Sequence, residues 1–60
     1  MAGKFVINMD KAGEFRFKLV ATNGQTIAVS EGYTTKASAM NGIKSVQENA
    51  ATANIEDTTI

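Results

Sequence analysis

The chain has 60 residues, six basic and six acidic, and therefore no formal net charge; it contains neither cysteine nor histidine. Their absence excludes disulfides, thiolate zinc sites and nucleophilic triads that use histidine as the base. A chain without net charge also lacks the overall attraction to phosphate or anionic lipid that most nucleic-acid and membrane-surface binders show.

The length predicts a single domain over residues 1–60. Hydrophobic residues make up 43% of the chain, too many for a disordered protein. No apolar run approaches the ~20 residues of a membrane-spanning helix, and the first residues lack the apolar core of a signal peptide, so we expect a cytoplasmic protein. Folding at this size buries only about 60% of the surface of the unfolded chain, so we expect self-association to add stability.

Three runs, residues 4–9, 14–21 and 26–30, alternate apolar with polar side chains. Alternation over runs rich in β-branched and aromatic residues predicts three strands. The apolar side chains that we expect on the core side of the sheet are Phe5, Ile7, Met9, Phe15, Phe17, Leu19, Ala21, Ile27 and Val29.

The first pair of strands is expected to form a hairpin with a three-residue turn over residues 11–13. Gly13 would adopt the left-handed conformation that this type of turn requires. The resulting register places Met9 opposite Phe15 and Phe5 opposite Leu19, so the apolar side chains share one face.

The second hairpin has two possible registers. A two-residue turn at Asn23 and Gly24 would pair Leu19 with Ala28 and move Ile27 to the other face of the sheet. A three-residue turn over residues 22–24 would pair Leu19 with Ile27 and, two residues further, Phe17 with Val29. We predict the second register because it keeps the apolar side chains together.

Residues 36–49 contain good helix formers and predict a helix, with Thr35 or Thr34 as its N-cap. Gly42 lies within the apolar stripe of this helix, which suggests a close approach to the sheet, since a mid-helix glycine otherwise costs up to ~1 kcal/mol. The stripe comprises Ala39, Gly42, Ile43, Val46 and Ala50, with Met40 at its edge.

Residues 53–57 predict a short fourth strand in which Ile55 is the strongly apolar residue. The fold class is therefore α+β: a three-stranded antiparallel meander, one helix on one face, and a short C-terminal strand (βββαβ).

No set of residues predicts catalysis. A lysine replacing histidine as the base must be buried beside a serine, and a pair of carboxylates needs a cleft between them. The sequence favours neither arrangement, so we expect no catalytic residue, no cofactor and no metal.

Two surfaces are candidates for an interaction. The first is the segment before the helix, with Ser30, Glu31, Tyr33 and Lys36, because a helix N-terminus can bind anions. The structural interpretation of this segment is that Tyr33 covers the edge of the core and Glu31 pairs with Lys36.

The second candidate surface is the exposed sheet face, where Lys4, Arg16 and Lys18 alternate with apolar side chains and can contact a nucleic-acid backbone. The three phenylalanines lie on the opposite face, so we interpret them as core residues and not as platforms for stacking bases. A solvated face, used partly for self-pairing, is the interpretation that we favour.

Five segments carry a resemblance that covers residues 4–57. They are residues 13–19, 21–25, 30–33, 36–37 and 41–46. On these segments the chain resembles the YegP-like family of small bacterial proteins, most of them of unknown function. The resemblance implies a three-strand, helix, strand unit, present as two tandem copies or as one copy that pairs with a second chain. It therefore implies a homodimer whose sheet is joined across the dimer by exchanged C-terminal strands, and it supplies no established catalytic or ligand residues to transfer to this chain.

The sequence favours a homodimeric module without catalytic chemistry, such as a binding or stress-related structural protein. The alternative is a nucleic-acid-associated protein that uses the basic sheet face. A small enzyme with a site at the dimer interface, lined by Tyr33, Lys36 and Glu31, has less support because no feature points to a reaction. Whether a small molecule binds is left open.

Overall fold

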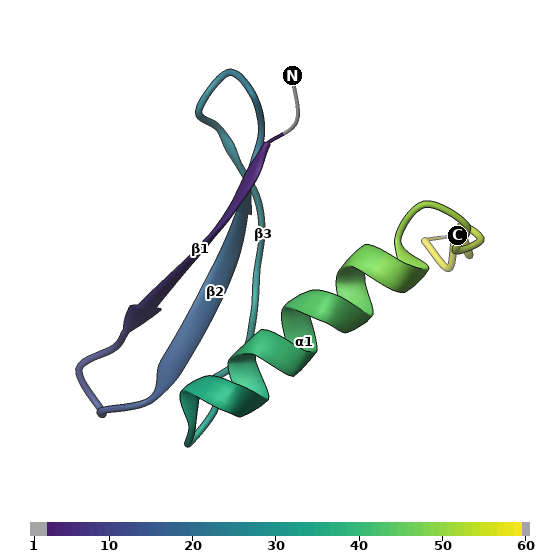
Figure 1. Cartoon of the computed structure of the whole chain (residues 1–60). Coiled ribbons are helices and arrows are strands. Elements are labelled where there is room, and N and C mark those ends of the chain that lie inside the picture. The colour runs from purple at the N-terminus through teal and green to yellow at the C-terminus, as the bar shows by residue number, and fades with distance from the viewer. Residues whose placement is uncertain (1–2, 60) are drawn as a thin grey trace.

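The computed structural model describes residues 3–59, which form one antiparallel sheet and one helix (Figure 1). Strands β1 (Lys4–Met9), β2 (Phe15–Val20) and β3 (Thr26–Val29) lie in the order β1-β2-β3. Helix α1 (Lys36–Asn49) packs against β2 on one face of the sheet. The predicted meander with one covering helix is confirmed.

The hairpin of β1 and β2 has the predicted register. Met9 lies opposite Phe15 and Phe5 lies opposite Leu19. Gly13 has a φ of 82°, in the left-handed region that favours glycine. The alternation of apolar residues and the turn chemistry agree here, so local sequence was sufficient to predict the pairing.

The predicted turn between β2 and β3 is also correct. The Ala21 N–H donates to the Gln25 carbonyl oxygen at 2.8 Å, which closes a three-residue turn over residues 22–24. Gly24 adopts a φ of 88°. A bulky residue at this position would be strained, because side chains with a Cβ rarely occupy that region.

The predicted pairing of Leu19 with Ile27 is wrong, because β3 contains a β-bulge. Val20 lies opposite Thr26, but Leu19 lies opposite Ala28, which leaves Ile27 as an extra residue. One extra residue reverses the alternation of every side chain beyond it.

The bulge moves the end of β3 out of the predicted core. Val29 lies opposite Lys18 instead of Phe17 and is 73% exposed, and Ile27 itself is exposed. Helix α1 makes its main contacts with β2, and Val29, opposite Lys18, points to the face of the sheet away from the helix. The expected core positions at Ile27 and Val29 are therefore surface positions.

After β3 the chain continues alongside β2 towards the helix. The Ser30 N–H donates to the Phe17 carbonyl oxygen at 2.8 Å, at the place predicted for Val29. Tyr33 and Phe15 then exchange two backbone hydrogen bonds of 2.7 and 2.8 Å. This irregular extension of the ladder fixes the position from which α1 begins.

The core lies between β2 and α1. Phe17, Ala39 and Ile43 are buried there. The Phe17 ring meets the Phe5 ring edge to face at 5.9 Å and stacks with the Tyr33 ring at 6.1 Å. The predicted role of Tyr33 as a cover for the edge of the core is thus confirmed.

Helix α1 begins at the predicted N-cap, Thr35, whose hydroxyl accepts the Ser38 N–H at 3.1 Å. Ala50, predicted to lie on the buried stripe, is instead the exposed C-cap. The reason is visible in Figure 1, where the C-terminal half of the helix extends beyond the sheet.

Residues 53–57, predicted as a fourth strand, have no regular secondary structure in this chain, and every side chain among them is exposed. Ile55 is 96% exposed. A strand requires a neighbour for its ladder hydrogen bonds, and within residues 3–59 the segment has none. The fourth strand therefore stays a prediction that depends on a partner.

Candidate functional site: an apolar hollow beside an open strand edge

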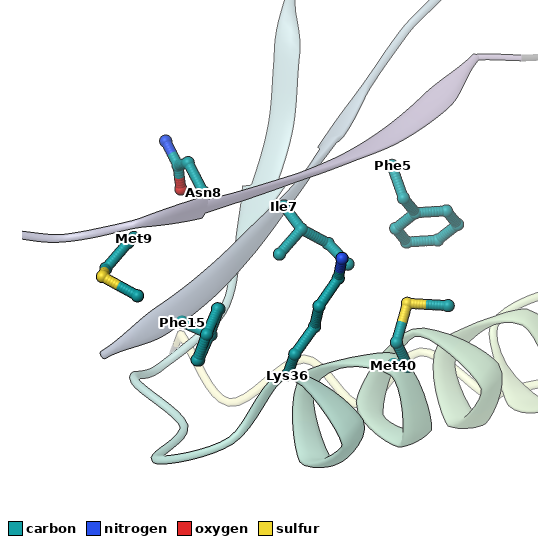
Figure 2. Close-up of a pocket in the computed structure, with 7 residues that line it drawn as sticks. All are labelled: Phe5, Ile7, Asn8, Met9, Phe15, Lys36 and Met40. Atoms are coloured by element: carbon teal, nitrogen blue, oxygen red, sulfur yellow. The ribbon is translucent and has the colours of Figure 1, made fainter. Parts of the chain in front are cut away.

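A hollow of about 600 Å³ lies between β1 and the first turns of α1 (Figure 2). Most of its lining is apolar, and Lys36 is the one charged residue among the described residues that line it. The lining residues are Phe5, Ile7, Asn8, Met9, Phe15, Lys36 and Met40.

The hollow exists because α1 lies over the middle strand of the sheet. Phe5, Ile7 and Met9 alternate to the helix side of β1, but the helix packs on β2. Lys36 and Met40, four residues apart, lie on the same side of the helix and face this gap. Met9 and Met40 consequently remain 58% and 51% exposed.

Strand β1 is also an open edge of the sheet, since within the described residues it pairs with β2 alone. Asp10 donates its N–H to the Glu14 carbonyl oxygen at 2.9 Å, so this pair is hydrogen bonded. In an antiparallel ladder, hydrogen-bonded pairs alternate with pairs that are not hydrogen bonded. Met9, Ile7 and Phe5 are in pairs of the second kind, so their backbone N–H and C=O groups point away from β2. Phe5, Ile7 and Met9 thus line the hollow with their side chains and also direct their backbone N–H and C=O groups towards the open edge.

The hollow was not foreseen from the sequence. The alternation of residues 4–9 correctly assigned Phe5, Ile7 and Met9 to the helix side, and we interpreted that side as core. Only the offset of the helix from β1 leaves these side chains uncovered. A signal was present in the two methionines, a residue type that is common at adaptable binding surfaces.

The segment predicted as a first interaction surface is mostly structural. The Ser30 hydroxyl accepts the Phe17 N–H at 2.9 Å and donates to the Glu31 carbonyl oxygen at 2.8 Å. The Tyr33 ring stacks on Phe17. The expected pairing of Glu31 with Lys36 is absent from the described part of the chain, where Lys36 instead lines the hollow.

The second predicted surface, the sheet face without the helix, has its arginine already engaged. Arg16 Nε donates to Asp10 Oδ2 at 2.7 Å, and Arg16 Nη1 donates to the Ser30 carbonyl oxygen at 3.1 Å. Arg16 therefore connects the first turn to the end of the third strand. Lys4 and Lys18 are the lysines of this face that the structure describes outside any ion pair.

The carboxylate of Asp10 organises the turn that follows β1. Its Oδ1 atom accepts the N–H groups of Ala12 and Glu14, at 2.9 and 3.0 Å. The hydrogen bond from the Arg16 side chain, followed by the one from the Glu14 backbone, holds the pKa of Asp10 below its ordinary value. The same contact with Asp10 raises the pKa of Arg16.

These contacts predict an acid-dependent loss of stability. A carboxylate whose pKa is lowered by folding stabilises the native state above its unfolded pKa, and this contribution disappears as the pH falls. We expect Asp10→Asn to lower the urea midpoint at pH 7, and the difference from wild type to be smaller at about pH 3, because the contribution is lost as the pH falls through the lowered pKa of Asp10. An equal difference at both pH values would contradict this role of the carboxylate.

Within residues 3–59 no group of three or more acidic, histidine or cysteine side chains is arranged to hold a metal ion. In the same part of the chain, α1 is too short and too polar to cross a membrane.

Comparison with known families matches residues 10–57 to the domain of unknown function DUF1508. The chain belongs to this family. It is the YegP-like family that the sequence resembles, so that interpretation is confirmed.

Several relatives of this YegP-like chain are named UPF0339 protein, and these relatives have two different lengths. One from Treponema denticola is 55% identical over 53 residues, which cover 88% of this chain and 91% of the relative. One from Stutzerimonas stutzeri is 58% identical over 50 residues, 83% of this chain but 45% of the relative. The chain thus spans less than half of some relatives and nearly all of others.

Two solved structures have the same fold. The solution structure of a protein from Haloferax volcanii has a TM-score of 0.86 at 36% identity, covering 95% of this chain and 97% of that one. A protein from Agrobacterium tumefaciens has a TM-score of 0.80 at 51% identity, covering 95% and 92%. A Methanosarcina acetivorans relative is 50% identical over 52 residues. Because Haloferax and Methanosarcina are archaea, the expectation of a purely bacterial family is wrong.

Proposed function

We propose that this YegP-like protein is a homodimeric binding or structural module without catalytic chemistry, in which each chain inserts residues 53–57 into the hollow of the other. The observation that carries the proposal is the coincidence of an open edge and an apolar hollow on β1. Phe5, Ile7 and Met9 offer backbone groups for a new ladder and side chains for apolar contacts. Recognition by strand addition combines these two elements.

The C-terminal segment has the properties of such a strand. Ile55 is an almost fully exposed apolar side chain, and residues 53–57 have no ladder partner within the described part of this chain. The segment lies beyond the C-terminal end of α1, away from the sheet (Figure 1). Insertion into a second chain would bury Ile55 and satisfy its backbone groups together.

The lengths of the relatives support a second copy as the partner. The Stutzerimonas and Acinetobacter baylyi relatives match this chain over 45% and 46% of their own length, so each has room for two such units. A chain of one unit would obtain the same arrangement by pairing with a copy of itself.

The lack of catalytic chemistry is part of the proposal. The chain has no cysteine or histidine, and the charged group of the hollow is a single lysine ammonium. Among residues 3–59, no other titratable side chain lines the hollow to accept or donate a proton beside Lys36. The names of the relatives state no reaction.

The absolute mass of the protein, measured by light scattering during size exclusion at several concentrations, tests the proposal. We expect a mass of two chains for wild type. Ile55→Asp places a charge in the apolar interface and should raise the dissociation constant by at least about tenfold, equivalent to ~1.4 kcal/mol. The control is Ile27→Asp, at a residue that is 62% exposed on the opposite edge strand and should not change the mass. Wild type that remains a single chain up to about 1 mM, the weak end of specific association, would overturn the proposal.

Nucleic-acid binding by the helix-free sheet face is a weaker candidate. Lys4 and Lys18 support it, because they share that face by strand alternation and are outside any described ion pair. Arg16 counts against it, because its guanidinium is already held by Asp10. Binding of a single-stranded oligonucleotide that weakens steeply with salt and is lost in Lys18→Glu would favour this candidate.

A further inference from the structure

Lys36 places a positive charge beside any strand that fills the hollow. Figure 2 shows its side chain extending from the start of α1 towards Ile7, between the end formed by Met9 and Phe15 and the end formed by Phe5 and Met40. A strand inserted here would displace water from the ammonium group. A cation that loses water without gaining a partner is costly, so an inserted strand needs an anionic group at this point.

The C-terminal segment carries such a group at the right spacing. In a strand, side chains two residues apart lie on the same face, roughly 7 Å from each other. When Ile55 faces the hollow, Asp57 faces it too, and Glu56 faces the opposite side. The segment thus presents one apolar side chain followed by one carboxylate, to a hollow with apolar walls and one ammonium group.

Asp57 is held in its charged form by its own surroundings. Its Oδ1 atom accepts the Thr59 hydroxyl at 2.6 Å and the Thr59 N–H at 3.0 Å. These two hydrogen bonds lower the pKa of Asp57.

We propose that Asp57 of the inserted segment forms an ion pair with Lys36 of the receiving chain, and that this pair, together with Ile55 in the hollow, sets the register in which the strand enters. The inference rests on the proposed function and adds to it an electrostatic contact that acts with Ile55 to select one register. A shift by one residue would turn both Ile55 and Asp57 out of the hollow and bring Asn54 and Glu56 in, which leaves a carboxylate near Lys36 but no apolar side chain for the hollow. Only the first alignment therefore provides both the apolar contact and the ion pair.

A charge swap tests the pair. Lys36→Glu and Asp57→Lys should each raise the dissociation constant of the dimer by at least about fivefold at low salt, at the upper range of a partly exposed ion pair. The double variant restores opposite charges and should return the dissociation constant to within about twofold of wild type. This is much less than a tenfold change, which corresponds to ~1.4 kcal/mol. The difference between single and double variants should shrink in about 1 M salt, where the screening length is ~3 Å.

The Lys36→Glu variant separates the ion pair from effects on the helix. A negative side chain in the first turn of a helix is favourable to it, so weaker dimerisation would not result from a less stable α1. Lys44→Glu is the matched control, since Lys44 is an exposed helix residue outside the lining of the hollow. It should leave the dissociation constant unchanged.

The outcomes distinguish this inference from the proposed function. If Ile55→Asp disrupts a wild-type dimer but the charge swap does not restore it, the ion pair is wrong and strand insertion stands. If wild type is a single chain, both are wrong. If that single chain binds decanoate, detected by NMR shifts of the Met9 and Met40 methyl groups and lost in Lys36→Glu, the hollow is instead a site for small apolar carboxylates.

Discussion

Phe17→Ala is expected to leave the protein largely unfolded at room temperature. Removing a buried aromatic side chain from a core costs ~3–5 kcal/mol, and a domain of this length has a free energy of unfolding of roughly 3–9 kcal/mol. Phe17 is the buried residue at which three elements meet: its ring contacts Phe5 from β1 and Tyr33 from the segment before α1, and its backbone pairs with Ser30. A cavity there weakens all these contacts together.

Urea and thermal unfolding followed by circular dichroism measure this loss. All variants should be compared at one protein concentration, because self-association would add to the apparent stability. Ile27→Ala is the control: it also shortens a large apolar side chain in the sheet, but at an exposed position, and should change the free energy of unfolding by about 0.5 kcal/mol or less. If Phe17→Ala unfolded at the same midpoint as Ile27→Ala, the core would be incorrectly placed.

Gly42→Val should destabilise the protein by about 3 kcal/mol, at the upper end of the range for overpacking a core. A Cβ at residue 42 would lie 2.7 Å from the Tyr33 hydroxyl oxygen and 3.0 Å from Phe17 Cε2, both closer than normal contacts. Valine is stiff at χ1, so its two methyl groups could not rotate away from these rings. Valine also has a higher helix propensity than glycine, so any loss of stability must come from packing.

Asn41→Val provides the matched control, because it introduces the same side chain at the neighbouring, exposed position of α1. Chemical unfolding should show little change for this variant. A second comparison uses the smaller Gly42→Ala change alone and together with Tyr33→Phe. Removing the Tyr33 hydroxyl should recover part of the stability that Gly42→Ala loses. A double-mutant cycle would measure this recovery as a coupling between the two positions. Equal stability of Gly42→Val and Asn41→Val would show that the helix does not approach the sheet closely at this point.

The close approach at Gly42 also explains where the hollow lies. With no side chain at this position, α1 can rest directly on the rings of Phe17 and Tyr33, both aligned with β2. The helix is therefore centred on the middle strand, and β1 keeps an uncovered apolar face. The close approach at Gly42 could be predicted from the sequence, but its consequence for the neighbouring strand could not.

Within the candidate site, the sequence indicated Lys36 as a surface residue but not the residues that lie beside it. Lys36 was assigned to a surface with Ser30, Glu31 and Tyr33, whereas the structure uses Ser30 and Tyr33 to extend the ladder along β2. Lys36 instead joins Met40 and the side chains of β1. Proximity along the chain was a poor guide here, because neighbouring residues in an irregular segment point in different directions.

The sequence by itself determined the elements and the chemistry that is excluded. Alternation specified β1 and β2 and their register, Gly13 and Gly24 specified the turns, and Thr35 specified the start of α1. These features follow from local physics: the two-residue period of a strand, the conformations available to glycine, and the capping of a helix end. The missing cysteine and histidine likewise limit the chemistry in any fold.

Only the tertiary structure decided which apolar residues are covered. The bulge at Ile27 exposes the end of β3, and the position of α1 over β2 leaves the hollow beside β1. Both depend on how elements fit against one another, since the energy of a side chain depends on what packs over it and not on its period along the chain. The same sequence pattern therefore describes the buried Phe17 and the accessible Met9.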